Sequence, residues 1–269
     1  GDYLSLHRKM KRYASIILVL ALVSCGGKKE DQGTDEADRA AVEMLQGVWL
    51  DDNTEMPILK VKGDSMYLAS QVNAPFRFGV SGDTLISYGA EKTAYRIQKL
   101  GEHVLQFYTS MGDLMSLHKA ETDTIPFGYE VEEAAPEPQV IQKDSVFMYE
   151  GNRYRGYAYI NPSTKKVIRP GITDEGLKVD NVFYDNVIHI CVYQGTRRLY
   201  SKDITKEMFA GSVPDNFLRG AILSDMDFMG VDAKGYHYRA TICIPDGSSC
   251  YYVDLLIDRE DNLTYMLKQ

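Results

Sequence analysis

The sequence lacks any apolar run long enough to cross a membrane as a helix, and it lacks the common catalytic fingerprints. Its longest apolar stretch, residues 13–24, covers 12 positions, whereas a bilayer core of about 30 Å takes about 20 residues. The motifs Gly-x-Ser-x-Gly and His-Glu-x-x-His, the P-loop and the dinucleotide glycine fingerprint are all missing. We therefore predict no catalytic residue, no metal site and no cofactor, and we favour a noncatalytic protein over an enzyme.

Basic charge and cysteine are also scarce. The 30 lysine and arginine residues are outnumbered by 38 aspartate and glutamate residues, which gives a formal net charge of −8. Without residues 1–24 the counts become 26 and 37, and the net charge becomes −11. So acidic a chain repels a phosphate backbone, and we therefore expect no nucleic acid partner. The four cysteines are Cys25, Cys191, Cys243 and Cys250.

The apolar stretch has the layout of a secretory leader, because it follows a basic flank and ends at Cys25. Its last residues, Leu22-Val23-Ser24-Cys25, resemble the lipobox of bacterial lipoproteins, whose cysteine thiolate takes a lipid. The resemblance implies cleavage before this cysteine. We expect residues 1–24 to be an upstream extension plus a signal peptide. Cys25 is then the lipid attachment site that joins the protein to a membrane.

Residues 25–43 are mostly polar and show no apolar periodicity, so we expect a flexible tether. Within it, Lys28, Lys29, Glu30 and Asp31 resemble the surface-export signal of Bacteroidetes-type lipoproteins. That resemblance implies an outer-membrane lipoprotein that faces the medium. A solvated spacer accounts for the same charges, and the side of the membrane stays open.

The remaining chain contains two bodies separated by an acidic, proline-containing linker. The linker is expected at residues 121–143, between bodies at 44–120 and 144–269, both of ordinary domain size. Short strand-like segments alternate with glycine turns in both bodies. This pattern predicts an all-β protein with two small antiparallel domains, a meander or barrel followed by a β-sandwich-like sheet domain.

In the first body, glycine turns recur at Gly63, Gly82, Gly101 and Gly112. Three-residue loops at the second and third turns predict that Val80 pairs with Ile86 and Phe78 with Tyr88, and that Ile97 pairs with Leu105 and Tyr95 with Phe107. The body opens with Leu45-Gln46-Gly47-Val48-Trp49, which contains the only tryptophan of the chain. This motif at the start of a meander resembles the small lipocalin-like domains of bacterial lipoproteins. The resemblance implies that Trp49 closes one end of a barrel rather than binding a ligand.

In the second body, the clearest turn is Pro245-Asp246-Gly247-Ser248. A symmetric hairpin about it pairs Ile242 with Tyr251 and places Cys243 opposite Cys250, close enough for a disulfide. Cys191 is then left as a free thiol. Overall this body resembles the C-terminal domains of unknown function in the same class of lipoproteins.

Three other features bear on a site. His189 and Cys191 lie two apart on an expected strand, hence on one face, but the sequence places no third ligand and a structural histidine is favoured. Residues 225–232 have the spacing of a calcium loop, although Met229 occupies a ligand position, so a surface turn is favoured. Nineteen tyrosines are present, with crowding at Tyr149, Tyr154, Tyr157 and Tyr159. Such rings suit a glycan or a protein partner, or simply half-buried strand positions.

These observations favour a noncatalytic cell-envelope lipoprotein that presents β domains to a ligand or partner. A lipid-tethered hydrolase with a site assembled by the fold is one alternative. A calycin-type carrier of a small apolar ligand is another. A deep pocket with convergent polar groups would favour the hydrolase, an open tyrosine-rich face would favour binding, and a filled barrel core would exclude the carrier. The sequence leaves the oligomeric state open.

Overall fold

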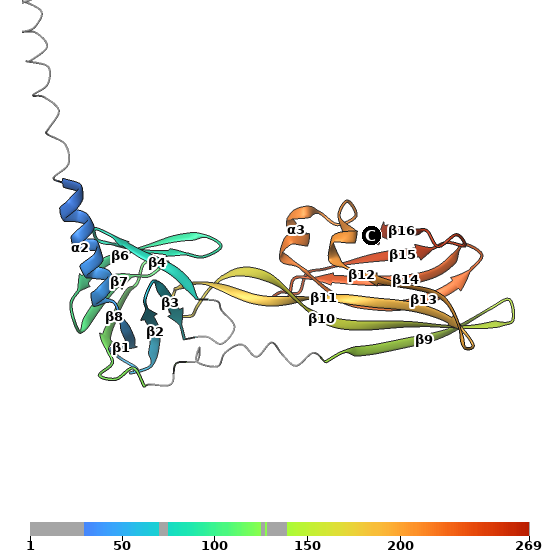
Figure 1. Cartoon of the computed structure of the whole chain (residues 1–269), viewed down its shortest axis with the longest axis horizontal. Coiled ribbons are helices and arrows are strands. Elements are labelled where there is room, and N and C mark those ends of the chain that lie inside the picture. The colour runs from blue at the N-terminus through green and yellow to red at the C-terminus, as the bar shows by residue number, and fades with distance from the viewer. Residues whose placement is uncertain (1–29, 70–74, 125–126, 128–138, 269) are drawn as a thin grey trace, which may run out of the picture. The chain divides into compact units, whose positions relative to one another are not determined.

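The computed structural model describes residues 30–69, 75–124, 127 and 139–268 (Figure 1). The chain divides into two compact units with a boundary near residue 125. Both units are built from antiparallel strands, so the predicted all-β class with two β domains is confirmed. The expected leader, Cys25 and most of the expected linker lie outside the described residues. Within the described ranges, no helix has the length and apolar character needed to cross a membrane.

The first unit contains a closed eight-stranded barrel in which each strand pairs with the next and the last pairs with the first. Its strands are β1 (Gly47–Asp51), β2 (Pro57–Lys62), β3 (Ser65–Leu68), β4 (Phe76–Ser81), β5 (Thr84–Tyr88), β6 (Lys92–Leu100), β7 (Val104–Tyr108) and β8 (Leu114–Lys119). Large side chains fill the interior, and six of them are less than 2 % exposed: Trp49, Leu59, Leu85, Leu105, Phe107 and Leu117. Side chains that lined a solvent-filled cavity would be exposed to it, so the barrel core is packed.

The Leu-x-Gly-x-Trp motif joins the helix before the barrel to the first strand. Leu45 and Trp49 are buried, and the indole Nε1 of Trp49 donates a hydrogen bond of 2.8 Å to the Leu45 carbonyl. Gly47 turns the chain with a φ of 117°, which a side chain would disfavour. The amide of Gln46 bonds to both the backbone N–H and the carbonyl of Gly63 in the next turn. The motif therefore fixes how the chain enters the barrel.

The expected flexible tether at residues 25–43 is wrong for its described part, because α2 (Glu30–Met44) is a helix. Its alanine, glutamate and arginine residues are good helix formers, and this propensity outweighs the missing apolar periodicity. Contacts with the barrel also hold it. The carboxylate of Asp38 accepts a hydrogen bond of 2.9 Å from the Gly82 N–H, and Lys119 Nζ donates one of 2.6 Å to the Met44 carbonyl. The second bond pairs a carbonyl that the helix end leaves free.

The predicted pairings at two turns of the barrel are wrong. Val80 pairs with Leu85, because Gly82 takes a φ of 60° and closes a two-residue turn instead of a three-residue loop. Ile97 pairs with Phe107 rather than Leu105, because the turn lies later in the sequence than expected and pairs Leu100 with Leu105; a β-bulge between Ile97 and Lys99 offsets one residue of this shift. The order of the strands is unaffected by these shifts.

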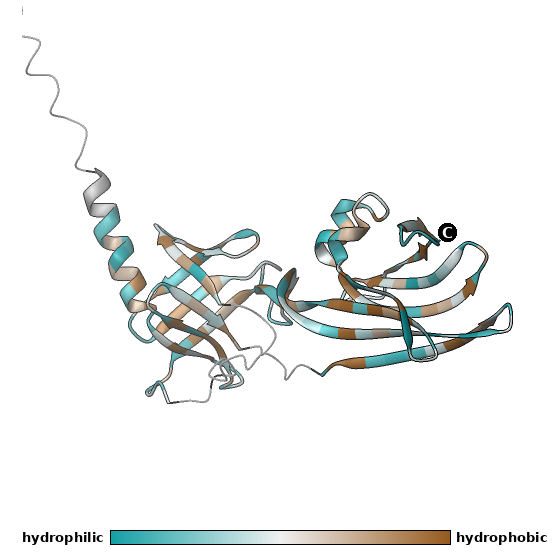
Figure 2. Cartoon of the chain, turned by 45° about the vertical axis from the view of Figure 1, so that its right-hand side comes forward, coloured by the Kyte–Doolittle hydropathy of each residue, from teal (hydrophilic) through white to brown (hydrophobic). Residues whose placement is uncertain are grey.

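The second unit is a sandwich of two four-stranded sheets. One sheet contains β9 (Ile141–Tyr149), β10 (Asn152–Ile172), β11 (Lys178–Gln194) and β12 (Arg197–Ile204); the other contains β13 (Ile222–Asp232), β14 (Gly235–Cys243), β15 (Cys250–Ile257) and β16 (Leu263–Leu267). A 3-10 helix, η1 (Lys206–Phe209), and a short helix, α3 (Asp215–Gly220), connect them. Hydrophobic and hydrophilic residues alternate along these strands (Figure 2), and the hydrophobic side chains of both sheets meet in one core.

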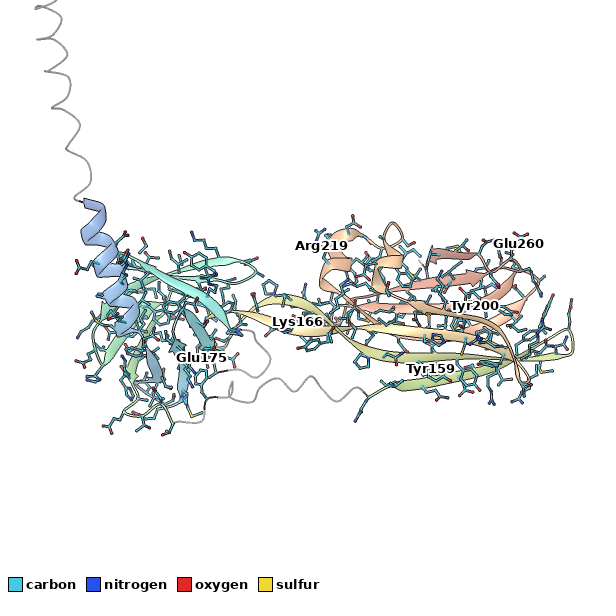
Figure 3. All side chains as sticks on the ribbon, viewed as in Figure 1. Tyr159, Lys166, Glu175, Tyr200, Arg219 and Glu260 are labelled. Carbon is cyan, nitrogen blue, oxygen red and sulfur yellow. A yellow bond between two sulfur atoms is a disulfide. The ribbon has the colours of Figure 1, made fainter. Side chains whose placement is uncertain are left out.

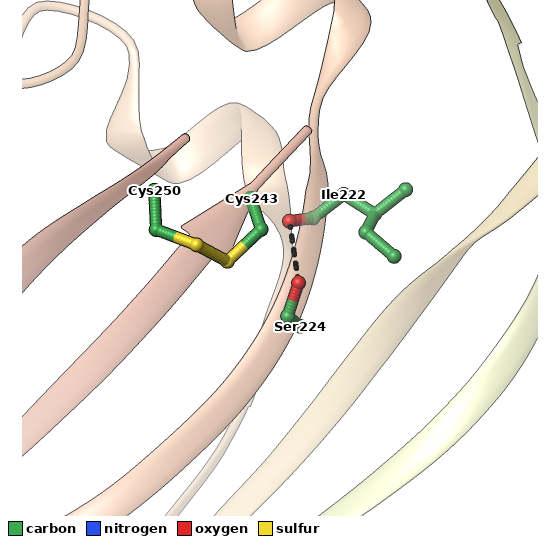
Figure 4. The surroundings of a disulfide bond; sticks show 4 residues. All are labelled: Ile222, Ser224, Cys243 and Cys250. Carbon is green, nitrogen blue, oxygen red and sulfur yellow. Dashed lines mark hydrogen bonds between the residues drawn. A yellow bond between two sulfur atoms is a disulfide. The ribbon is translucent and has the colours of Figure 1, made fainter. Parts of the chain in front are cut away.

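The hairpin of β14 and β15 has the predicted register. Ile242 pairs with Tyr251, Arg239 with Asp254 and Cys243 with Cys250. The two cysteines form a disulfide across the end of this hairpin, with Cα atoms 4.1 Å apart (Figure 4). Cys191 is a free and buried thiol.

One segment expected to be a surface turn is a strand. Residues 225–232 belong to β13, in which Met226 and Phe228 are buried in the core. Asp225 and Asp227 alternate with them on the opposite face, where both carboxylates pair with Lys143 Nζ at distances of 2.8 and 2.5 Å. Alternation of polar and apolar residues is typical of a strand, and this pattern explains why the segment forms a strand instead of the expected turn. Likewise, β9 begins at Ile141, inside the region expected to be linker.

Candidate ligand-binding groove

The two faces of the sheet β9–β12 carry different side chains. On β10, Tyr154, Ala158 and Ile160 point into the sandwich core. Because side chains alternate along a strand, Arg155, Tyr157 and Tyr159 lie on the outer face. Figure 3 labels Tyr159 on this sheet. On the neighbouring strand β11, Tyr193 pairs with Arg155, Cys191 with Tyr157 and His189 with Tyr159, so these three also lie on the outer face.

The aromatic rings of the outer face form a contiguous cluster. The rings of Tyr157 and Tyr159 are nearly parallel, with an interplanar angle of 15° and centroids 5.9 Å apart. Tyr193 meets Tyr157 edge-on at 5.8 Å, and His189 lies 6.2 Å from Tyr159. The three tyrosines are only half-buried. The cluster therefore exposes parts of the tyrosine rings, together with their hydroxyl groups, to solvent.

This cluster lines an open groove of about 560 Å³. The lining residues are Arg153, Arg155, Tyr157, Tyr159, Tyr193, Gly195 and Thr196. The volume lies in the range of about 300–1,000 Å³ that is usual for small-molecule sites. We call these seven residues the tyrosine groove.

Arginine supplies the charge of the tyrosine groove. The guanidinium of Arg155 lies 6.0 Å from the Tyr157 ring centroid, and its Nη1 donates a 3.4 Å hydrogen bond to the Tyr157 hydroxyl. This bond and the charge of nearby Asp144, 3.3 Å from the Arg155 Nε, raise the pKa of Arg155 above its already high ordinary value. Arg153 is exposed and has no ion-pair partner in the described part of the chain. The groove therefore keeps at least one uncompensated positive charge.

A core tyrosine holds the strands beneath the groove. The hydroxyl of Tyr238, on β14 of the opposite sheet, lies 3.0 Å from the carbonyl oxygens of both Tyr157 and Cys191 and donates its hydrogen to this pair of acceptors. Tyr238 is fully buried, and this burial raises its pKa well above the ordinary value. The hydroxyl is therefore un-ionised and fixes the two strands that carry the aromatic rings.

The neighbouring pair His189 and Cys191 is not arranged for nucleophilic catalysis. Nδ1 of His189 is 2.7 Å from the carboxylate of Asp203 on β12, so this carboxylate orients the ring. Burial raises the pKa of the Cys191 thiol, although Arg198 opposes this effect. A thiol with a raised pKa holds little thiolate near neutral pH and is a weak nucleophile. Among the described residues, no group of three or more histidine, cysteine, aspartate or glutamate side chains could hold a metal ion.

The structure divides the tyrosine cluster expected from the sequence. Tyr157 and Tyr159 lie in the groove, whereas Tyr154 is buried in the core, 6.2 Å from the ring of Tyr236. Tyr149 lies at the end of β9, where Arg259 covers its ring at 5.7 Å. Sequence reasoning missed the other groove residues, which are Arg153, Arg155, Tyr193, Gly195 and Thr196. Arg153 and Arg155 could have been predicted, because every second residue from Arg153 to Tyr159 lies on the same face of a strand.

A second polar cluster, at the other end of the sandwich, is structural. Lys206 Nζ lies 3.6 Å from the carboxylate of Asp185, and both side chains are less than 10 % exposed. Lys206 donates a 2.7 Å hydrogen bond to the Ala221 carbonyl, and Asp185 accepts from the N–H groups of Leu223 and Asn186. Burial lowers the pKa of Lys206, and Asp185 opposes that effect. Both charges have partners, so the pair connects β11 to η1 and β13 rather than facing a ligand.

Comparisons with known proteins place the sandwich in a family. No curated protein matches the chain. Residues 121–265 match the family described as domain of unknown function DUF4738. The matched range contains β9–β15 and most of β16, and it exceeds half of the 269 residues. The chain therefore belongs to the DUF4738 family.

Proposed function

We propose that the protein is a noncatalytic cell-envelope lipoprotein that is anchored through lipid on Cys25 and binds a ligand in the tyrosine groove. The groove is the observation that carries the binding part of the proposal. Its half-buried rings, hydroxyl groups and guanidinium groups lie on the outer face of a sheet whose inner face already supplies the core. The core does not use these rings, and their half-buried position on the outer face leaves them able to contact a ligand.

Two observations support a location outside the cytoplasm. The leader ends in a lipobox-like sequence at Cys25. In addition, Cys243 and Cys250 form a disulfide, and structural disulfides are rare in the reducing cytosol. Both support export from the cytoplasm, and we propose that the protein is an outer-membrane lipoprotein with Lys28, Lys29, Glu30 and Asp31 as its export signal. The first two of these residues lie outside the described ranges, and the other two begin α2.

The two alternative functions receive less support. A carrier of an apolar ligand needs a cavity in the barrel, and six large side chains of the barrel interior are less than 2 % exposed. A hydrolase with a cysteine nucleophile needs an activated thiol, and the thiol beside the groove has a raised pKa. The groove is open and three of its seven lining residues are tyrosines, which is more typical of binding than of bond cleavage.

The binding part is tested with the full-length protein, purified in a nonionic detergent and applied to arrays of glycans and envelope proteins. The test variant combines Tyr157→Ala with Tyr159→Ala. We expect the wild-type protein to retain at least one array component that the variant loses. Equal retention by the two proteins would contradict the role of the groove. A matched control is Tyr252→Ala, which removes an exposed ring from β15 on the other sheet.

The anchoring part is tested in the native host. We expect a palmitate analogue to label the wild-type protein and not the Cys25→Ser variant, which should leave the membrane fraction. Labelling that survives this substitution would contradict lipidation at this residue. Protease treatment of intact cells then decides the side of the membrane, because only a protein that faces the medium is degraded.

A further inference from the structure

We infer that the ligand of the tyrosine groove is an anionic saccharide, that is, a short sugar chain carrying carboxylate or sulfate groups. This inference rests on the proposed function and names the chemical class of its ligand. It follows from three properties of the groove: its charge, its size and its mixture of ring faces with hydrogen-bonding groups.

The charge of the groove is opposite to that of the chain. The protein has a formal net charge of −8, but two of the seven groove residues are arginines and none is acidic. The rim has one further arginine, because Arg198 on β12 pairs with Tyr193. Asp144 neutralises part of the charge on Arg155, and Arg153 has no partner among the described residues. A guanidinium group binds carboxylate and sulfate oxygens through paired N–H donors, so the groove favours an anionic ligand.

The size of the groove favours a small ligand over a folded protein partner. A stable protein interface takes about 20–30 residues from each partner and about 800 Å² from each surface. Seven residues line the groove, around a concave volume of about 560 Å³. This is enough for a few sugar units, and it is well below the footprint of a protein.

The groove chemistry favours a sugar over a wholly apolar or a wholly ionic ligand. A sugar ring presents C–H groups on its faces and hydroxyl groups on its edge. The parallel rings of Tyr157 and Tyr159 offer apolar faces to the C–H groups of the sugar. The hydroxyls of Thr196 and the tyrosines offer hydrogen bonds to the hydroxyl groups of the sugar. Arg153 and Arg155 then distinguish an acidic sugar from a neutral one. Stacking sets the affinity for sugars in general, and the guanidinium groups set the preference for anions.

Isothermal titration calorimetry of the full-length protein in nonionic detergent tests this inference. The probes are oligogalacturonate, a chondroitin sulfate oligosaccharide and a neutral maltooligosaccharide, all of similar length. We expect at least one acidic probe to bind at least tenfold more tightly than the neutral probe. Raising the salt concentration from 50 to 500 mM should weaken acidic binding severalfold. Comparison of the two acidic probes shows whether carboxylate or sulfate is preferred.

Two variants separate the roles of charge and stacking. Arg153→Gln combined with Arg155→Gln should reduce the affinity for the acidic probe at least tenfold and leave the neutral probe unchanged. Tyr157→Ala combined with Tyr159→Ala should abolish binding of both. Arg219→Gln, which removes an exposed guanidinium from α3, is the matched control and should bind as the wild type does.

Two results would overturn the inference. Neither decides the proposed function, which the array experiment tests separately. Equal affinity for acidic and neutral probes, with no effect of the arginine substitutions, would show that the groove does not select anions. Absence of binding to all three probes, together with a protein retained on the array through Tyr157 and Tyr159, would replace the saccharide with a protein partner. If the wild type and the double tyrosine variant also retain the same array components, the proposed binding function of the groove is contradicted.

Discussion

The two faces of the sheet β9–β12 come from the same strands and carry different chemistry. The inner face contributes Ala158, Ile160, Ile188, Ile190 and Val192, all at most 5 % exposed, to the sandwich core. The outer face carries parallel tyrosine rings, a histidine and arginines. Stability therefore resides in one set of alternate residues and the proposed binding in the other. Substitutions on the two faces should separate these properties.

The largest expected effect is on the inner face. Ile190→Ala removes a fully buried side chain from the C-terminal half of β11 and leaves a cavity, which should lower the free energy of unfolding by about 2–5 kcal/mol. Ile190→Val, the graded control, should cost about 0.5–1.5 kcal/mol. Urea denaturation followed by circular dichroism measures both. A cost below 0.5 kcal/mol for the alanine variant would mean that this face does not hold the sandwich together.

A smaller effect is expected for the bond that joins the two sheets beneath the groove. Tyr238→Phe removes the hydroxyl that reaches the carbonyls of Tyr157 and Cys191. Because these buried acceptors lose a donor, the free energy of unfolding should fall by about 1–2 kcal/mol. Amide hydrogen exchange should also rise in β10 and β11 near these two residues. Unchanged exchange would show that the hydroxyl does not fix these strands.

A still smaller effect on stability is expected on the outer face. Tyr159→Ala removes a half-buried ring, so the free energy of unfolding should change by less than about 1 kcal/mol. Thermal unfolding monitored by fluorescence measures it. A loss of 2 kcal/mol or more would mean that the ring serves folding, and the comparison between the faces would fail.

The smallest effect is expected for the ion pair at the edge of the cluster. Asp203→Asn removes the charge that pairs with His189, and both side chains are more than a third exposed. Solvent screens such a pair, so the free energy of unfolding should change by about 0.5 kcal/mol or less. The same denaturation measurement, repeated at high salt, should give no difference between variant and wild type.

Much of the architecture could be predicted from the sequence, and the errors have local physical causes. The hairpin of β14 and β15 was predictable because a single proline-glycine turn fixes its register and pairs Cys243 with Cys250. The barrel pairings shifted because Gly82, with a positive φ, closes a two-residue turn, and because the turn after β6 lies later than expected and pairs Leu100 with Leu105. Helix α2 was missed because its stability comes from helix propensity and from contacts such as Asp38 with Gly82, rather than from an apolar stripe.

The site was predictable only in part. Crowding of tyrosines pointed to β10, and Tyr157 and Tyr159 do share a face. Tyr193 joins them only through the pairing of β10 with β11, which joins residues more than thirty positions apart. No local pattern fixes that register, because β10 and β11 are both long strands and a bulge interrupts their pairing after Pro162.

The separation of the two faces is tested most directly by measuring ligand affinity and melting temperature together. The proteins are the wild type, the Tyr157→Ala and Tyr159→Ala double variant, and Ile190→Ala, each titrated with the array component that the wild type retains. The double variant should lose at least tenfold in affinity with a nearly unchanged melting temperature. The Ile190 variant should melt several degrees lower and bind as the wild type does while folded. Equal affinities for the double variant and the wild type would contradict the binding role of the outer face.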